Sequence, residues 1–280
     1  MNDKYLLLDV ANLAHRAMHT VHEMRHPDDP NMATGVLYQI GVTAEKLQGI
    51  YSTWNVAFYF DSRQSKRREV YAGYKADREV KRTSETDEMK LRRQQMYDQV
   101  SALPKLLHQM GCQNIFGQTG YEADDLIAST VYNNPLENFV IVSRDEDLLQ
   151  LLSPSVCVHD VVTKEPYTVD DFWKEYEISP TQWSSVKAWA GCASDNVQGL
   201  PGVGEKTAIK FMRGKLAETS SKYKLFVDNL DVYVRNMELV RLPLKGVNEI
   251  KLTPQATPIK WSILAEHIGA VTFGWDMPNE

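Results

Sequence analysis

Short apolar runs recur along the first half of the chain, and each is closed by an aspartate. The runs read KYLLLD, VAFYFD and FVIVSRD, and their closing aspartates are Asp9, Asp61 and Asp145. Short runs without polar alternation are typical of strands that are buried on both faces of a parallel sheet. We therefore predict three such strands, each with an acidic side chain at its carboxyl end.

Helical patterns separate the predicted strands. Residues 34–50 form one pattern, residues 96–110 carry apolar side chains at i, i+4 and i+7, and a third pattern surrounds Leu126 and Val131. Strands that alternate with helices predict a doubly wound α/β sheet. Ligands of such sheets bind at the carboxyl ends of the strands. The three aspartates are therefore expected to face one crevice.

The pattern changes after residue 165. Thr168 is followed by acidic residues that fit a first helical turn, which predicts the start of a helix. A glycine-rich stretch, GLPGVGEKTA, occupies residues 199–208 and is followed by further helical patterns. We predict an α/β domain at 1–165 and a mainly helical region at 166–280.

Composition places the chain among soluble globular proteins. Its 280 residues are 43% hydrophobic and 24% charged, which are ordinary values for that class. No stretch reaches the roughly 18 apolar residues of a membrane span. The three cysteines are widely spaced and form no disulfide framework, which favours a reducing compartment. We expect a cytoplasmic monomer with no membrane partner.

Positive charge is concentrated in one segment of an acidic chain. The net charge of −6 alone argues weakly against a nucleic-acid partner. Residues 63–82, however, hold eight lysines and arginines against three acids, so this segment carries +5 and the rest of the chain −11. A local basic strip on an acidic protein often marks a site for a polyanion. A solvated charged helix is the alternative interpretation.

Carboxylates gather in three further places. They are Glu122, Asp124 and Asp125 in YEADDL, Asp147 two residues after Asp145, and Asp195 before the glycine-rich stretch. Acids in a first helical turn can also be simple caps. If all these side chains share one crevice, they repel one another unless divalent cations bind there. Oxygen ligands suit Mg²⁺ or Mn²⁺, and two such ions about 4 Å apart promote phosphodiester hydrolysis.

In five segments the sequence resembles the structure-specific 5′ nucleases, the family of flap endonucleases and 5′→3′ exonucleases. The segments read, in chain order, LLLDVANLAHR, FDSRQSKRREVYAGYKADR, GYEADDLIA, SRDEDLLQLL and SDNVQGLPGVGEKTA. The resemblance covers about residues 4–245. It implies a PIN-like α/β fold, a helical arch at about 75–105 and a helix-three-turn-helix (a helix-hairpin-helix) at about 185–215 that binds DNA.

The resemblance implies two metal ions, Mg²⁺ or Mn²⁺, in the crevice. The implied ligands are Asp9, Asp61, Glu122 and Asp124 for the first ion, Asp145, Asp147 and Asp195 for the second, and Asp125 between them. The implied catalytic residues are Asp9, Asp61, Asp124, Lys75 and Arg78. Lys75 would stabilise developing charge, and Arg78 would position the scissile phosphate.

The resemblance also implies DNA contacts along the basic strip and in the glycine-rich stretch. The implied contacts are Arg16, Arg67, Tyr74, Lys75, Arg78, Gly202, Gly204, Lys206 and Thr207. Gly202 and Gly204 would let a phosphate approach the backbone, next to the free N–H groups of a helix start. A K⁺ ion held by backbone carbonyls of this hairpin is implied as well. For Tyr74, a place in the core is the alternative to stacking on a base.

The implied activity is that of a flap endonuclease and 5′→3′ exonuclease in DNA replication and repair. The expected substrate is DNA with a 5′ flap, a nick or a free 5′ end, cut near a junction of single strand and duplex. A DNA polymerase would act with it in trans, in a prokaryotic or phage-infected cell. The alternatives are a junction-binding protein with attenuated catalysis and an RNA-directed nuclease of the related PIN architecture.

One position departs from the pattern of the family. Cys192 stands in GCASDN, where the family usually has an aspartate. A thiol is a soft, largely protonated ligand and a poor partner for Mg²⁺. We therefore predict that the second metal ion binds weakly. The alternative is that Cys192 fills a small space in the core and that water completes the site.

Overall fold

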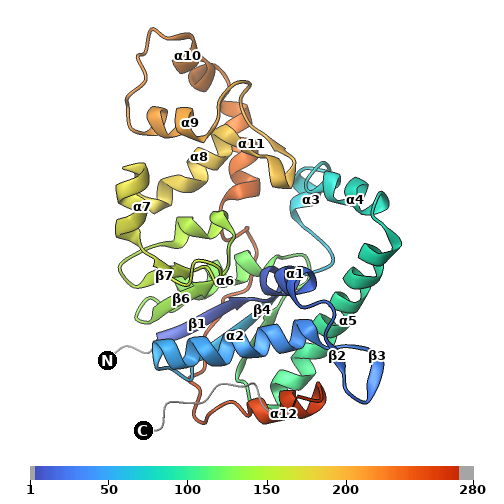
Figure 1. The fold of residues 1–280 in the computed structure, drawn as a ribbon. Coiled ribbons are helices and arrows are strands. Elements are labelled where there is room, and N and C mark those ends of the chain that lie inside the picture. Colours follow the sequence, from blue (N-terminus) through green and yellow to red (C-terminus); the bar gives the residue numbers. More distant parts are fainter. Residues whose placement is uncertain (1–3, 271–280) are drawn as a thin grey trace.

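The computed structural model describes residues 4–270, and a six-stranded sheet forms its centre (Figure 1). The strand order is β5-β4-β1-β6-β7-β8, and every pairing is parallel except that of β7 with β8. The strands are β1 (Lys4–Asp9), β4 (Val56–Phe60), β5 (Asn114–Gly117), β6 (Asn138–Val142), β7 (Val156–His159) and β8 (Pro166–Tyr167). The predicted α/β class with a mainly parallel sheet is confirmed.

The three strands predicted from apolar runs lie side by side in the sheet, in the order β4-β1-β6. Leu6, Leu7 and Leu8 of β1 are fully buried, as expected of a strand that is covered on both faces. The third predicted run extends to Asp145, whereas β6 already ends at Val142, where polar residues begin. The sequence did not predict β5, β7 and β8, because each has only two to four residues.

Helices cover both faces of the sheet. Leu6 and Leu8 pack toward one face, and Tyr5 and Leu7 toward the other. The first face carries α1 (Val10–Thr20), α2 (Gly35–Tyr51), α5 (Asp87–Gln109) and α12 (Trp261–His267), and the second carries α6 (Ala123–Asn133) and the 3-10 helix η1 (Glu146–Leu151). The three helices predicted in the first half of the chain correspond to α2, α5 and α6.

The polar helix α4 and the start of α5 leave the core in the region predicted for the arch. The short helix α3 (Arg67–Val70) leads to α4 (Ala76–Thr83), which buries none of its side chains. The long helix α5 then returns to the sheet (Figure 1). Thr86 caps α5, and the first side chain that α5 buries is that of Met96. The start of α5 and all of α4 therefore project from the core.

The second part of the chain is mainly helical and continues the core of the α6 face. Thr168 caps the first of its helices in a capping box with Asp171, as predicted. One hydrophobic cluster runs from Leu7 of the sheet through Trp183 to Phe226. The elements are α7 (Val169–Tyr176), η2 (Pro180–Gln182), α8 (Trp183–Ala190), β9 (Gly191–Cys192), η3 (Ala193–Asp195), β10 (Val197–Gln198), α9 (Glu205–Met212), α10 (Ser221–Asp228) and α11 (Leu230–Val240). The glycine-rich stretch joins β10 to α9.

The remaining segments close the fold. A hairpin of β2 (Arg25–His26) and β3 (Asp29–Ala33) joins α1 to α2. After α11 the chain returns to the sheet, where the backbone of Thr253 and the side chain of Asn114 exchange hydrogen bonds of 2.8 and 2.9 Å. Within residues 4–270, no helix has both the length and the apolar character that a membrane crossing requires.

Candidate active site

Two aspartates are held at the carboxyl ends of neighbouring strands. Asp9 ends β1 and caps α1: its Oδ1 accepts from the backbone N–H of Asn12 at 3.0 Å and its Oδ2 from the Ser143 hydroxyl at 2.9 Å. Asp61 follows β4, and its Oδ1 accepts from the backbone N–H of Ala123 at 2.7 Å. Because β1 and β4 pair in parallel, both carboxylates lie at one edge of the sheet.

The start of α6 brings two more carboxylates to this edge. Glu122 is the N-cap of α6 and forms a capping box with Asp125. Asp124 lies in the first turn, and its Oδ1 accepts from the backbone N–H of Asp125 at 2.7 Å. The helix start is tied to the end of β4 through the bond between Ala123 and Asp61. We call Asp9, Asp61, Glu122 and Asp124 the first cluster.

The first cluster holds more negative charge than a buried site favours. Burial and the charge of Asp61 raise the pKa of Asp9 to about 7. Burial also raises the pKa of Asp124 well above its usual range. The side chain of Asp61 keeps contact with solvent, but its surroundings desolvate it enough to raise its pKa too. A divalent cation would balance this charge.

Two cations at the start of α4 reach the carboxylates. Lys75 Nζ lies 2.7 Å from Glu122 Oε2 and 3.8 Å from Asp195 Oδ2, and an Arg78 nitrogen lies 2.7 Å from Asp195 Oδ1. The backbone of Lys75 is left-handed, with φ of 54°, and its N–H donates to the carbonyl oxygen of Asp195 at 2.8 Å. Burial alone would raise the pKa of Glu122, but Lys75 and Arg67 outweigh it, so this pKa is lowered.

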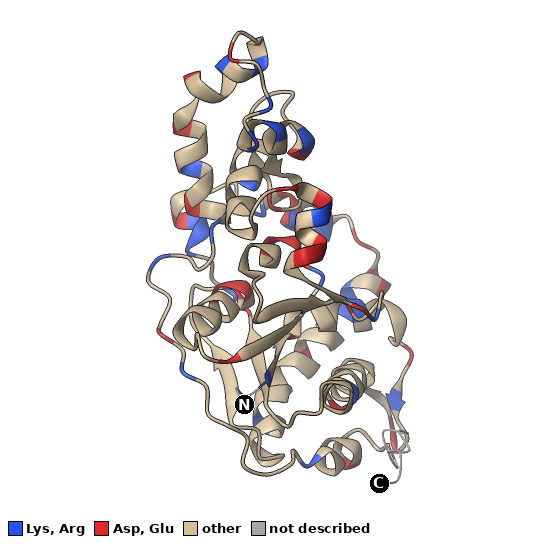
Figure 2. Ribbon diagram, turned by 90° about the vertical axis from the view of Figure 1, so that its left-hand side faces the viewer, with Lys and Arg blue, Asp and Glu red and all other residues tan. Residues whose placement is uncertain are grey.

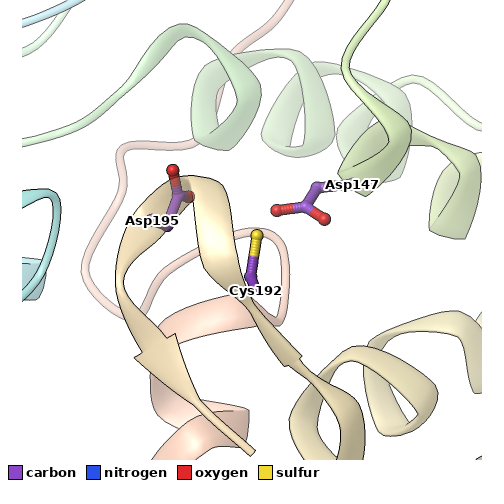
Figure 3. Close-up of side chains that lie close together, drawn as sticks. All are labelled: Asp147, Cys192 and Asp195. Atoms are coloured by element: carbon purple, nitrogen blue, oxygen red, sulfur yellow. The ribbon is translucent and has the colours of Figure 1, made fainter. Parts of the chain in front are cut away.

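A second group of possible metal ligands lies beside the first cluster. Asp147, Cys192 and Asp195 each offer one ligand atom, and these atoms lie within 4.8 Å of one another (Figure 3). Burial and the charge of Asp145 raise the pKa of Asp147 to about 7. The side chain of Asp145 caps η1 by accepting from the backbone N–H of Asp147 at 2.9 Å. We call Asp147, Cys192 and Asp195 the second cluster.

A cavity of about 640 Å³ lies between the first cluster and α5. Asp61 and Glu122 line one side of it. The basic side chains in its wall are Arg63, Arg68, Lys75, Arg78 and Arg82. His15 of α1 lines it as well, and burial together with the charges of Arg82 and Arg78 lowers the pKa of this histidine. The cavity thus sets positive charge opposite carboxylates, as binding of a metal-bound phosphate requires.

Comparison with known sequences assigns the family. The family described as “5′-3′ exonuclease, N-terminal resolvase-like domain” matches residues 4–177. The chain belongs to the 5′-3′ exonuclease family. The resemblance drawn from the five sequence motifs is therefore confirmed.

Members of this family cover most of the chain. DNA polymerase I of Mycobacterium leprae (strain TN) is 30% identical over 260 residues, which are 85% of this chain and 27% of that protein. The 5′-3′ exonuclease of Mycoplasmopsis pulmonis is 30% identical over 210 residues, 74% of this chain and 65% of that protein. This chain therefore spans about a quarter of the length of its polymerase relatives.

A solved structure of the family shares the fold. It is the D15 flap endonuclease of bacteriophage T5 in a complex with DNA and metal ions. It superposes with a TM-score of 0.72 at 23% identity, over 86% of this chain and 89% of that one. The overall fold described above is thus shared with a solved flap endonuclease.

The structure contradicts the prediction that Arg67 of this chain contacts DNA. Its side chain is only 2% exposed, and its guanidinium pairs with both oxygens of Asp125, at 2.6 and 2.8 Å. Its Nε donates to the carbonyl of Leu239 at 2.8 Å. Asp125 is fully buried and also accepts from the backbone N–H of Leu244 at 2.8 Å. This pair joins α3 to α6, so Arg67 is unavailable to DNA, and Asp125 is removed from the candidate metal ligands.

Tyr74 requires a similar correction. It is 2% exposed and cannot stack on a base, so the alternative of a core position is the right one. Its hydroxyl donates to Glu122 Oε2 at 2.9 Å and to Asp195 Oδ2 at 3.2 Å. Tyr74 therefore links the first cluster to the second, a role that no sequence pattern indicated.

The other predicted DNA contacts lie where solvent reaches them. Arg16 is half-buried on α1, and Thr207 is half-buried in the first turn of α9. Gly202, Gly204 and Lys206 are exposed in the stretch that precedes and opens α9. Gly202 has a φ of 69°, which favours glycine.

The sequence did not indicate the role of Lys187, which joins the start of α9 to η1 beside the second cluster. The side chain of Lys187 on α8 is buried, and its Nζ lies 2.9 Å from both Glu146 and Glu205. Glu146 begins η1, next to Asp147, and Glu205 begins α9. A lone lysine within a helical pattern carries no signal for such a bridge.

Proposed function

We propose that this chain is a divalent-metal-dependent 5′ nuclease that hydrolyses phosphodiester bonds of DNA near junctions of single strand and duplex. The observation that carries this proposal is the meeting of the first-cluster carboxylates at one sheet edge, beside Lys75 and Arg78. Membership of the 5′-3′ exonuclease family and the DNA-bound T5 relative support it. The proposed substrate is DNA with a 5′ flap, a nick or a free 5′ end.

The first cluster is the proposed site of a hard divalent ion because of its ligand chemistry, although among the described His, Cys, Asp and Glu side chains only the second cluster places three ligand atoms within 4.8 Å of one another. Asp9, Asp61 and Asp124 offer only oxygen ligands, which suit Mg²⁺ or Mn²⁺. Burial raises the pKa of each of these carboxyl groups, and a bound cation would favour their charged forms. When bound, such an ion lowers the pKa of water and stabilises charge on the attacking and leaving oxygens. We propose Mg²⁺ for this cluster and a second, weaker metal position at the second cluster.

Lys75 and Arg78 are the proposed phosphate ligands. Both line the cavity beside the first cluster, and both pair with carboxylates there. A phosphate that enters the cavity can accept hydrogen bonds from Lys75 Nζ and the Arg78 guanidinium, and such charge-assisted bonds are strong. They stabilise the charge that develops as the phosphodiester is cleaved. The cavity between the first cluster and α5 is the proposed path of the 5′ single strand.

The glycine-rich stretch at residues 199–208, which leads into α9, is the proposed binding site for duplex DNA. Gly202 and Gly204 leave the backbone open to a phosphate, and Lys206 adds charge. Lysines and arginines outnumber acids in residues 205–228, and both kinds of charge are visible at this end of the molecule (Figure 2). Such contacts position a duplex without reading its sequence. A K⁺ ion on the hairpin carbonyls, a DNA polymerase acting in trans and a cytoplasmic location belong to the same proposal.

Cleavage of a 5′-flap duplex tests the function. We expect Mg²⁺ to support cleavage near the junction of a flap substrate, EDTA to abolish it, and Ca²⁺ to allow binding without cleavage. A blunt duplex of the same sequence with blocked ends is the control. Binding in Ca²⁺ with no cleavage in Mg²⁺ or Mn²⁺ would instead support the alternative of a junction-binding protein.

A further inference from the structure

The second cluster mixes sulfur with oxygen. The thiol of Cys192 lies between the carboxylates of Asp147 and Asp195 (Figure 3). The three side chains come from η1, β9 and η3, and their ligand atoms lie within 4.8 Å of one another. Ligand atoms around one tetrahedral ion lie about 3.5 Å apart. Small rotations of these side chains would therefore bring all three atoms onto a single ion.

The three ligand atoms retain free lone pairs. Among the described residues, no donor bonds the carboxylate of Asp147. Within residues 4–270, the sulfur of Cys192 has one hydrogen-bond partner, the hydroxyl of Ser194 at 3.1 Å. Asp195 accepts from Arg78 on one oxygen and from Tyr74 on the other, and each of these oxygens has a second lone pair. An ion can thus bind without breaking the contacts that hold Asp195.

Ligand chemistry decides which ion fits. Mg²⁺ requires oxygen ligands in a nearly octahedral arrangement and does not favour sulfur. Zn²⁺ and its relatives Co²⁺ and Cd²⁺ bind thiolate and carboxylate together in tetrahedral sites that leave one position open. We propose that Asp147, Cys192 and Asp195 form a site for a thiophilic divalent ion of the Zn²⁺ class, which discriminates against Mg²⁺. This inference rests on the proposed function, because it concerns the second metal position of that nuclease.

Binding would change the protonation of Cys192. The thiol proton leaves to solvent as the sulfur–metal bond forms, so one proton is released for each ion that binds through the thiolate. The nuclease would then carry two unlike metal positions, an all-oxygen first cluster for Mg²⁺ and a sulfur-containing second cluster. The metal content of the cell would thereby set which ion occupies the second position.

Co²⁺ provides a direct test, because a thiolate–Co²⁺ bond absorbs in the near ultraviolet. We expect this absorption in the wild-type protein and its loss in Cys192→Ser and Cys192→Asp. Cys157→Ser is the matched control, since Cys157 is also half-buried but lies on β7 away from the second cluster, and it should keep the absorption. Absorption that persists in Cys192→Ser, or is absent from the wild type, would overturn the proposal.

Competition in the wild-type protein tests selectivity without any variant. Zn²⁺ at equal concentration should displace Co²⁺ and remove the absorption, whereas a hundredfold excess of Mg²⁺ should not. Displacement by Mg²⁺ would contradict the proposal even if the variants fail to fold.

Flap cleavage in the same preparations separates this inference from the proposed function. Cys192→Asp should lower the Mg²⁺ concentration for half-maximal cleavage about tenfold, because it restores an oxygen ligand. Thiolate absorption without any cleavage would overturn the nuclease and leave the metal site standing. Cleavage without the absorption would overturn the proposed thiolate site and leave the proposed nuclease function standing.

Discussion

The two clusters lie side by side, but the fold positions them differently. The residues of the first cluster lie at the ends of the regular strands β1 and β4 and at the start of the helix α6. The hydrogen bond from the backbone N–H of Ala123 to Asp61 connects the end of β4 to the start of α6. The second cluster stands on η1, β9 and η3, which have six, two and three residues. The first cluster offers four carboxylates, whereas the second offers two carboxylates and the thiol of Cys192.

This difference suggests a division of work. Residues at the ends of neighbouring parallel strands are held precisely by the whole sheet, so the first cluster can fix an ion and a phosphate in one geometry. Residues on short irregular segments depend on local packing and on the bridge through Lys187. We therefore expect changes in the first cluster to abolish catalysis and changes in the second to adjust it.

The largest expected effect compares one carboxylate from each cluster. Asp61→Asn should lower the single-turnover rate of flap cleavage about a thousandfold, or about 4 kcal/mol, because it removes a proposed ligand of the proposed water-activating ion. Asp147→Asn should lower the rate only about tenfold to a hundredfold. Both variants should still bind flap DNA in Ca²⁺. Equal losses would contradict the division of work.

The next largest effect is on the free energy of unfolding, and it compares the buried side chains of Arg67 and Lys187. Arg67→Met should destabilise the fold by about 3 kcal/mol, because it leaves the fully buried carboxylate of Asp125 without its partner. Lys187→Met should cost less than about 1 kcal/mol, because Glu146 and Glu205 are 64% and 44% exposed and water can solvate them. Urea unfolding measures both values.

A double variant checks the reason for the Arg67 effect. In Arg67→Met with Asp125→Leu, both charges are gone and most of the lost stability should return. If the double variant is no more stable than Arg67→Met alone, packing rather than the unpaired charge causes the loss.

Much of the fold and part of the site follow from the sequence. Unbroken apolar runs end at Asp9 and Asp61, and parallel pairing alone brings strand ends together, so the meeting of these two aspartates could be predicted from pattern, whereas Glu122 and Asp124 were indicated by the family motif. The second cluster could not be placed in this way, because segments as short as β9 and η3 have no periodicity. Asp147 was indicated by the acidic group after the third apolar run, and Cys192 and Asp195 only by the motif around them.

The basic segment at residues 63–82 shows where prediction from local charge fails. It includes Lys75 and Arg78, which reach the carboxylates of Glu122 and Asp195. The resemblance implied DNA contact for Arg67 and Tyr74 in the same segment, yet both are buried. Each is held by a partner more than 40 positions away, Asp125 for Arg67 and Glu122 for Tyr74, and no local pattern contains that information.

A smaller effect on stability tests the negative charge of the first cluster when no metal ion is bound. The pKa of Asp9 is raised from the usual 3.8 to about 7, so the folded state binds this proton more tightly than the unfolded state. On account of this group, stability falls as pH rises from about 4 to about 7. Asp9→Asn carries no such charge and can still cap α1.

In EDTA we therefore expect Asp9→Asn to be more stable than the wild type by about 2 kcal/mol at pH 8, with a smaller difference at pH 5. Urea unfolding across this pH range measures it. Mg²⁺ should remove the advantage at pH 8, because it balances the wild-type carboxylates. A difference that stays constant with pH would show that charge is not its cause.

The smallest expected effect probes the contact between the clusters. The Tyr74 hydroxyl bonds Glu122 of the first cluster and Asp195 of the second, and Tyr74→Phe removes both bonds while keeping the ring. Glu122 keeps Lys75 and Asp195 keeps Arg78, so neither carboxylate is left unpaired. We expect cleavage to fall about tenfold, because this tyrosine orients residues of both clusters without reaching the reacting atoms. A loss as large as that of Asp61→Asn would mean that the two clusters act as one unit, whereas an unchanged rate would mean that they are independent.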